Sequence, residues 1–312
     1  MKIRKKINVM RYRKKIIGAL FLLGFSFSLS AQQDMLLTQE YFSRVNRNPA
    51  ATGNSNDIDI FLHGRIQWVG VDNGPKTFVL NATDYEDKIR SGFGLSYTFD
   101  AMGVKHHNSN LKVSYNYQFN LNKSNILALG LGAGVNMLSY DNLANIIDDE
   151  SERTDLPYLN DADRVISPDF SFGLDLNNPH FNFGASIDHI LAGEESNTHQ
   201  RRTLYAYVSV PFVLGEKLDM IPSLTYMHQK FTNVADLTLL FFLQRSYWAG
   251  VTWRPDVRDK MQQHILAFTL GFDIKKFRFG YSYDLGIGAD SHLPANTHEV
   301  MLSYGIGKKN KE

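Results

Sequence analysis

The chain has 312 residues, with 33 Lys and Arg against 32 Asp and Glu, and it contains no Cys. Hydrophobic residues make up 43% of the chain and charged residues 21%, a composition that excludes an ordinary disordered protein. The lack of Cys excludes a disulfide scaffold, a thiolate zinc site and a Cys nucleophile.

The N-terminus has the pattern of a secretory signal peptide. Eight basic residues and no acidic residue lie within residues 1–15, and an apolar run follows over residues 16–30. Small residues at its end suit cleavage after Ala31, so we predict a signal peptide over residues 1–31. A membrane anchor is the alternative, but the run is shorter than the roughly 20 residues that a spanning helix needs. Without this segment the chain is acidic, which predicts no nucleic-acid partner.

Residues 32–57 lack regular alternation, but Asn48-Pro49 and Gly53 favour turns. We predict an ordered N-terminal segment here, either periplasmic or inside a lumen. A barrel domain over residues 58–307 and a short C-terminal tail over residues 308–312 complete the expected organisation.

From residue 58 onward, apolar and polar residues alternate with the period of a β-strand. One such row consists of Phe277, Phe279, Tyr281 and Tyr283, alternating with Arg278, Gly280, Ser282 and Asp284. A soluble β-sandwich and a membrane β-barrel share this pattern. The barrel is favoured because the runs last about 10 residues, as a tilted membrane strand requires. It is also favoured because the polar rows are rich in Gly, Ser and Asn and the apolar rows in aromatic residues.

The connections also favour the barrel, because long and short connections alternate along the chain, and Ser139–Ser167 is the longest. We predict an all-β, transmembrane, antiparallel outer-membrane β-barrel with long extracellular loops and short periplasmic turns. An even strand number leaves both ends of the barrel in the periplasm. The predicted strands number about 14 and lie near residues 58–68, 76–85, 91–100, 109–119, 126–138, 168–176, 181–189, 203–213, 219–228, 233–243, 246–254, 264–274, 276–285 and 297–307.

Charged residues inside the predicted strands are expected to face the lumen, because a charge facing lipid near the midplane would cost about 2–4 kcal/mol. Asp188, Arg278, Asp284 and Glu299 fall on such inward positions. They could form a binding lumen or contact a plug. A network of salt bridges across a filled barrel is the interpretation that we favour.

Motifs that carry chemistry are few. Acidic residues within Ser139–Ser167 could hold Ca²⁺, although their spacing matches no EF-hand and a solvated acidic loop is the simpler interpretation. The sequence contains no HExxH motif and no GxSxG nucleophile elbow. We therefore predict no cofactor, no metal site and no catalytic residue, and a protein that is not an enzyme.

Several motifs resemble one known family. The stretch "NRNPAATG" lies shortly after the signal peptide, "RIQWVG" spans Arg65–Gly70, and Tyr281-Ser282-Tyr283-Asp284 and His298-Glu299 stand near the end. Over essentially the whole mature chain, this pattern resembles the PorP/SprF family of Bacteroidetes outer-membrane proteins, which is linked to the type IX secretion system. The resemblance implies structural roles for Asn48, Pro49 and Gly53 in an N-terminal turn, for Trp68 at the outer interface, and for Asp284, His298 and Glu299 in the last hairpin.

The resemblance also implies a function. It predicts a non-enzymatic outer-membrane barrel that assists secretion and surface anchoring of a partner protein, such as a gliding or surface adhesin. The implied partners are the C-terminal domain of that cargo at the extracellular face, other type IX secretion components and outer-membrane lipid. A passive or fatty-acid-type channel is the alternative, and a barrel enzyme is a third interpretation.

Overall fold

The computed structural model describes residues 37–55, 57–103, 106–140, 164–192, 201–230, 232–255, 263–288 and 296–307. All of them belong to one compact unit, Asp34–Glu312. The predicted signal peptide and the tail over residues 308–312 lie outside the described residues. Within the described ranges, no helix is long and apolar enough to cross a membrane.

Two short 3₁₀ helices precede a long series of strands. The helices are η1 (Glu40–Phe42) and η2 (Pro49–Ala51). The strands are β1 (Ile58–Ile66), β2 (Lys76–Glu86), β3 (Ser91–Met102), β4 (His106–Asn120), β5 (Ile126–Tyr140), β6 (Arg164–Asn178), β7 (Phe181–Asp188), β8 (Thr203–Ser209), β9 (Phe212–Val213), β10 (Leu218–Gln229), β11 (Thr232–Leu243), β12 (Tyr247–Pro255), β13 (Gln263–Ile274), β14 (Phe277–Gly288) and β15 (Thr297–Ile306).

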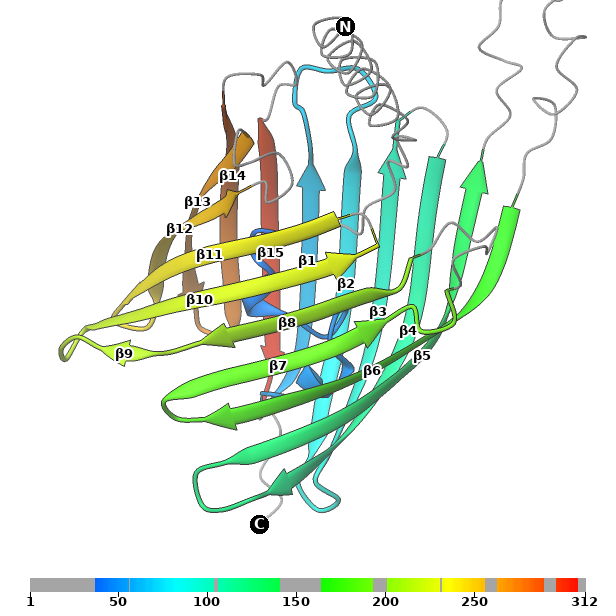
Figure 1. The fold of residues 1–312 in the computed structure, drawn as a ribbon. Helices are drawn as coiled ribbons and strands as arrows, with labels where there is room; N and C mark the ends of the chain where they lie inside the picture. The colour runs from blue at the N-terminus through cyan, green and yellow to red at the C-terminus, as the bar shows by residue number, and fades with distance from the viewer. Residues whose placement is uncertain are drawn as a thin grey trace, which may run out of the picture. The chain divides into compact units, whose positions relative to one another are not determined.

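These strands form one closed antiparallel ring (Figure 1). β1 pairs with β15, and β10 pairs with β11, so the sheet has no open side. β8 and β9 pair in turn with β10 and occupy one position in the wall, which therefore has 14 positions. The two are separated at Val210-Pro211, where Pro211 has no N–H for a strand ladder. The predicted antiparallel barrel of 14 strands is confirmed.

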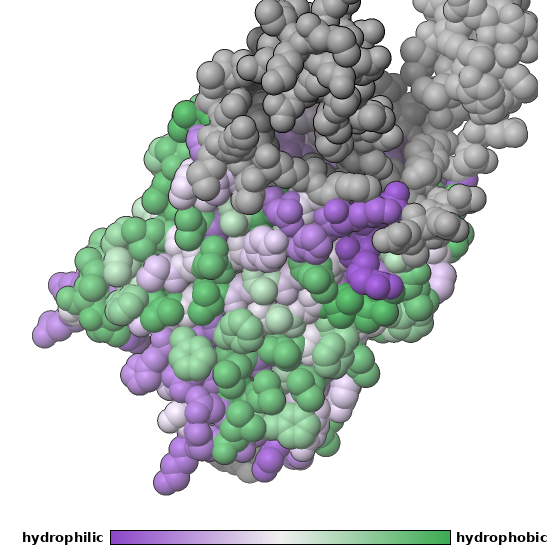
Figure 2. All heavy atoms as spheres, viewed as in Figure 1, coloured by the Kyte–Doolittle hydropathy of each residue, from purple (hydrophilic) through white to green (hydrophobic). Residues whose placement is uncertain are grey.

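The two faces of the wall have reversed polarity compared with a soluble protein. Along β4, Lys112 and Asn116 on the inner face are buried, whereas Leu111 and Val113 on the outer face are 50% and 58% exposed. Figure 2 shows apolar residues over much of the outer wall on the side drawn. An apolar outer band with a polar interior is the arrangement that a lipid-facing barrel requires.

The strands around the longest connection extend further than the sequence indicated. β4, β5 and β6 have 15 residues each, more than the about 9–11 that cross a bilayer. The two ends of the predicted connection Ser139–Ser167 therefore belong to strands β5 and β6. Its centre, residues 141–163, lies outside the described residues. We call this side of the barrel, where β1 ends and β15 begins, the long-connection end, and the opposite side the short-turn end.

Candidate functional site in the barrel lumen

The lumen is occupied by residues 37–55, which we call the lumenal segment (Figure 1). Asn48, Ala50 and Thr52 of this segment are 0% exposed. Wall glycines make room for it: a Cβ added to Gly130 would collide with the backbone of Ala50, and one added to Gly173 would collide with the side chain of Asn48. The small residues of the inner face thus serve close contact between the wall and the lumenal segment.

Asn48 fixes the second turn of the lumenal segment. It is the N-cap of η2, and its side-chain oxygen accepts a hydrogen bond of 3.0 Å from the N–H of Ala50. Its amide donates to the carbonyl of Leu174 at 2.9 Å and to the hydroxyl of Tyr207 at 3.1 Å. Pro49 is the first residue of η2, where its missing N–H has no helical partner to lose.

Wall side chains also hold the backbone that follows. The Asn116 amide donates to the carbonyl oxygens of Ala50 at 2.7 Å and Thr52 at 2.6 Å. Gly53 ends this stretch with φ +66°, a left-handed conformation that favours glycine. Because Asn116 is 0% exposed, losing either contact would leave a buried amide donor without a partner.

A buried charge cluster binds the start of the lumenal segment. Glu299, which is 0% exposed, accepts hydrogen bonds from the N–H groups of Thr38 at 2.9 Å and Gln39 at 3.2 Å. Its carboxylate lies 3.1 Å from Nε2 of His63 and 3.5 Å from Nη1 of Arg65. We call this set, together with the residues of the next paragraph, the glutamate cluster.

The glutamate cluster continues along the wall through Asp284. This carboxylate accepts a hydrogen bond of 2.9 Å from the Thr38 hydroxyl and lies 3.5 Å from Arg65 and 3.8 Å from Arg254. Arg254 in turn donates two hydrogen bonds of 2.7 Å to Asp236. Each buried acid in this cluster therefore has a cationic partner, as charges removed from water require.

A second buried cluster lies on β4, β6 and β7. The Lys112 ammonium is 2.5 Å from Asp188 and 3.6 Å from Asp169, and Nδ1 of His189 is 2.9 Å from Asp169. Asp169, Asp188 and His189 place ligand atoms within 4.8 Å of one another, as a metal site would. However, Lys112 already supplies a positive charge between the two carboxylates, so a side chain of the protein offsets part of their negative charge.

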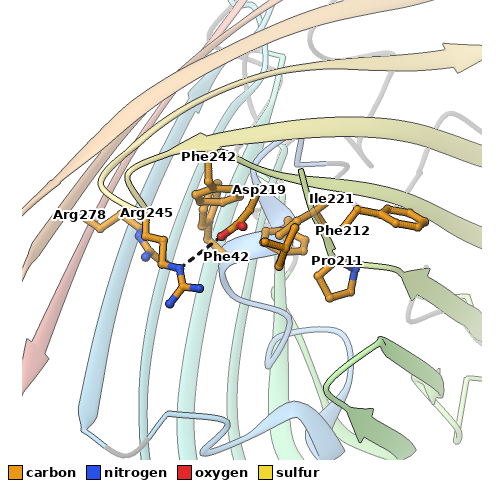
Figure 3. Close-up of a pocket in the computed structure, with 10 residues that line it drawn as sticks. Phe42, Pro211, Phe212, Asp219, Ile221, Phe242, Arg245 and Arg278 are labelled. Carbon is orange, nitrogen blue, oxygen red and sulfur yellow. Dashed lines mark hydrogen bonds and ion pairs between the residues drawn. The ribbon is translucent and has the colours of Figure 1, made fainter. Parts of the chain in front are cut away.

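A pocket of about 360 Å³ lies between the lumenal segment and the wall at the short-turn end (Figure 3). Phe42 and Phe242 line it, together with an Arg245–Asp219 ion pair of 3.3 Å. Arg278 also lines it, with its guanidinium 5.2 Å from the centre of the Phe42 ring. The pocket is mainly apolar, and the charges at its edge are paired.

Two groups of the lumenal segment titrate away from their usual range. Burial raises the pKa of the Glu40 carboxyl, and the guanidinium of Arg47, 3.6 Å away, opposes this shift. Burial also raises the pKa of the Tyr41 hydroxyl. Both directions follow from the removal of this segment from water.

The residues singled out from the sequence lie in several places. Asn48, Pro49 and Gly53 are in the lumenal segment, Asp284 and Glu299 are in the glutamate cluster, and Asp188 is paired with Lys112. Arg278 borders the pocket and donates two hydrogen bonds, of 2.9 and 2.8 Å, to Asp273. His298 faces outward, where Nδ1 lies 2.7 Å from the Tyr281 hydroxyl. Trp68 lies half-buried in the β1–β2 connection, with φ +54°.

Sequence reasoning missed the cations that complete these clusters. His63, Arg65, Lys112 and Arg254 all occupy inward positions of strands, and each lies against a buried acid. Their position in the polar rows was a usable signal, because inward charges in a barrel need partners. What the sequence did not reveal is which acid each one faces.

Solved outer-membrane barrels resemble this fold. The toluene transporter TbuX of Ralstonia pickettii aligns with a TM-score of 0.50 and 10% identity, over 84% of this chain and 92% of that chain. A deletion mutant of TodX, a monoaromatic hydrocarbon channel of P. putida, aligns with a TM-score of 0.52 and 8% identity, over 85% of this chain and 94% of that chain. At these identities the likeness concerns the fold alone.

No curated protein matches the sequence significantly. The model of one family matches residues 29–304, which is most of the chain. Its description is "Type IX secretion system membrane protein PorP/SprF", in agreement with the resemblance read from the motifs. The chain therefore belongs to the PorP/SprF family and is an integral outer-membrane protein of a Gram-negative bacterium.

Proposed function

We propose that this protein is a non-enzymatic barrel that assists the secretion of a partner protein, such as a gliding or surface adhesin, and anchors it at the cell surface. The observation that carries the proposal is the occupied lumen. The lumenal segment is held by buried hydrogen bonds from Asn116 and by buried charge in Glu299, at two separate levels of the wall. A barrel that serves as a fixed surface for a partner needs no open path, whereas a conduit does.

The long-connection end offers the surface for such a partner. β5 and β6 continue past the length that crosses the bilayer, so they carry the margins of the longest connection away from the membrane. Residues 141–163 are rich in acids, and their contacts with basic or polar groups of a cargo domain would be sensitive to salt. Other type IX secretion components and outer-membrane lipid are the remaining partners that we propose.

A passive or fatty-acid-type channel is the second candidate, and a toluene transporter and a monoaromatic hydrocarbon channel are built on a similar fold. This function would require the lumenal segment to leave the wall. Withdrawal would strip Glu299 of its bonds from Thr38 and Gln39, and Asn116 of two more. Each of these four hydrogen bonds contributes about 0.5–1.5 kcal/mol net of water, so their loss would disfavour the open state by several kcal/mol.

Two measurements separate these functions. Gentle detergent extraction, pull-down on this protein and mass spectrometry should recover a large secreted protein in a stable complex. In planar bilayers, the intact protein should show little conductance, and a variant lacking residues 37–55 should conduct. Failure to recover any secreted partner, together with steady conductance of the intact barrel, would favour the channel.

A further inference from the structure

The pocket at the short-turn end lies beside a break in the barrel wall. The break is at Val210-Pro211, which separates β8 from β9. Pro211, Phe212 and Val213 all line the pocket, and Figure 3 shows Pro211 and Phe212 on the side opposite Arg245. The pocket therefore meets the wall at the point where the strand ladder is interrupted.

β9 has a free edge at this break. On one side it pairs with β10, where Phe212 lies opposite Met220 and Val213 lies opposite Asp219. Among the described strands, none pairs with β9 on its other side. Residues opposite each other share a face, so Phe212 lies on the outer face with Met220, and Val213 on the inner face with Asp219. Because residues from both faces line one pocket, the pocket extends around the free edge of β9.

The apolar band of the outer wall reaches this level of the barrel. Leu218, Leu243 and Tyr247 lie opposite one another on β10, β11 and β12, and all three are exposed. Such a row faces the acyl chains of the membrane. Arg245, whose side chain is 82% exposed, lies directly beyond this row in the β11–β12 turn, at the level of the lipid headgroups. The free edge of β9 is therefore open to the periplasmic leaflet.

The pocket itself suits an acyl chain with an anionic headgroup. Phe42, Ile221 and Phe242 give it apolar walls, and its volume of about 360 Å³ lies within the range of small-molecule sites. At its edge, Nε of Arg245 donates to Asp219 at 3.3 Å. A guanidinium has five N–H donors in all, so Arg245 can keep this bond and also donate to a phosphate.

A peptide strand fits the same edge poorly. The N–H groups of Val210 and Leu214 both point toward β10, where they donate to Pro222 and Leu218. The residues that point away from β10 are therefore Pro211 and Val213, and Pro211 has no N–H. The edge thus offers a single backbone donor, whereas strand addition depends on a row of such groups.

We infer that this pocket binds one acyl chain of an anionic phospholipid from the periplasmic leaflet. The chain enters around the free edge of β9, and the phosphate lies at Arg245. A lipid held in this way contacts Phe42, so it joins the membrane to the lumenal segment. The inference concerns the short-turn end of the barrel and does not depend on the proposed role in secretion.

Photolabelling of the full chain in lipid discs tests this inference. The probe is phosphatidylglycerol with a diazirine in the middle of one acyl chain, and mass spectrometry identifies the labelled residues. Phe42 is the informative position, because it belongs to the lumenal segment inside the ring, which lipid on the outer wall does not reach. Ile221→Trp fills the pocket, and Leu224→Trp is its control at an exposed outer position of the same strand. Unboiled gels first establish that each variant is a folded barrel.

The expected result is labelling at Phe42 in the wild type. Ile221→Trp should reduce it by about tenfold, because a filled pocket leaves no room for the chain, and Leu224→Trp should not change it. A wild type labelled only on its outer wall would overturn the inference, as would equal labelling of Phe42 in the two variants. Labelling of Phe42 by a diazirine fatty acid but not by the phospholipid would also overturn it, since the occupant would then be a free acid.

The headgroup contact has a separate test that does not alter the pocket. Arg245→Gln removes an exposed charge, so labelling of Phe42 by phosphatidylglycerol should fall by about two- to fivefold. Labelling by an uncharged diacylglycerol with the same diazirine should stay unchanged in this variant. Equal labelling of wild type and Arg245→Gln by phosphatidylglycerol would show that Arg245 does not hold the phosphate and would overturn this part of the inference.

Discussion

The fit between the lumenal segment and the wall can be tested at Gly130. This glycine faces the lumen from β5, and a Cβ at this position would collide with the backbone N and Cα of Ala50. A backbone collision cannot be relieved by turning a side chain. Gly130→Val should therefore push the segment away from the wall, whereas Gly64→Val should not, since an added Cβ on Gly64 meets nothing within 4 Å.

The magnitude follows from the contacts around Ala50. Overpacking typically costs about 1–3 kcal/mol. Displacement also breaks the bonds from Asn116 to Ala50 and Thr52 and the bond from Asn48 to Leu174. Three bonds at about 0.5–1.5 kcal/mol each bring the total to about 2.5–7.5 kcal/mol. Since each 1.4 kcal/mol is a factor of ten, local opening of the segment should rise by about 10²–10⁵-fold.

Limited proteolysis measures this opening directly. The lumenal segment contains Arg44 and Arg47, which trypsin can cut only when the segment leaves the lumen. In the folded, detergent-solubilised barrel, Gly130→Val should be cut at these sites much faster than the wild type, as read by mass spectrometry of the fragments. If it is cut no faster than Gly64→Val while both remain folded, the backbone of the segment does not lie against Gly130.

Three further outcomes follow. Arg254→Ala should destabilise the barrel by about 3–5 kcal/mol, because it strands the buried carboxylate of Asp236. Arg245→Ala removes an ion pair whose arginine is 82% exposed and should change the free energy of unfolding by less than about 1 kcal/mol. Equal shifts of Arg254→Ala and Arg245→Ala in urea unfolding would contradict this reasoning. Lys112→Met should lower the temperature of heat modification on gels more than Lys112→Arg, and equal values would mean that its charge is dispensable. Deleting residues 141–163 should leave the barrel folded but reduce surface retention of the cargo, and wild-type retention would exclude this connection as the docking site.

The wall could be predicted closely because its signal is local. Alternation over β14, from Phe277 to Asp284, is visible in neighbouring residues, and a one-residue slip would turn every side chain to the wrong face. Strand ends were less certain. β5 continues to Tyr140 and β6 begins at Arg164, because the pairing of these two strands persists beyond the membrane without any change in the residue pattern.

The lumen could not be predicted to the same depth because its contacts are not local. Thr38 and Glu299 are 261 residues apart in the chain, and no periodicity links them. Asn48-Pro49 indicated a turn, but the partners of that turn, Leu174 and Tyr207, belong to two distant strands. The alternation of side chains along each strand identifies Arg65 and Lys112 as residues that face the lumen. Which acidic residues they face is determined only when the barrel closes.

The anchorage of Thr38 on Glu299 has a consequence for assembly of the barrel. The lumenal segment lies directly before β1, yet the carboxylate that accepts its first N–H groups is on β15, the last strand of the chain. A chain truncated before β15 would have every other wall strand but would lack the carboxylate that accepts the backbone N–H groups of Thr38 and Gln39. Periplasmic proteases could then reach the segment. Chains that lack the last strand would be degraded, so only complete barrels would accumulate.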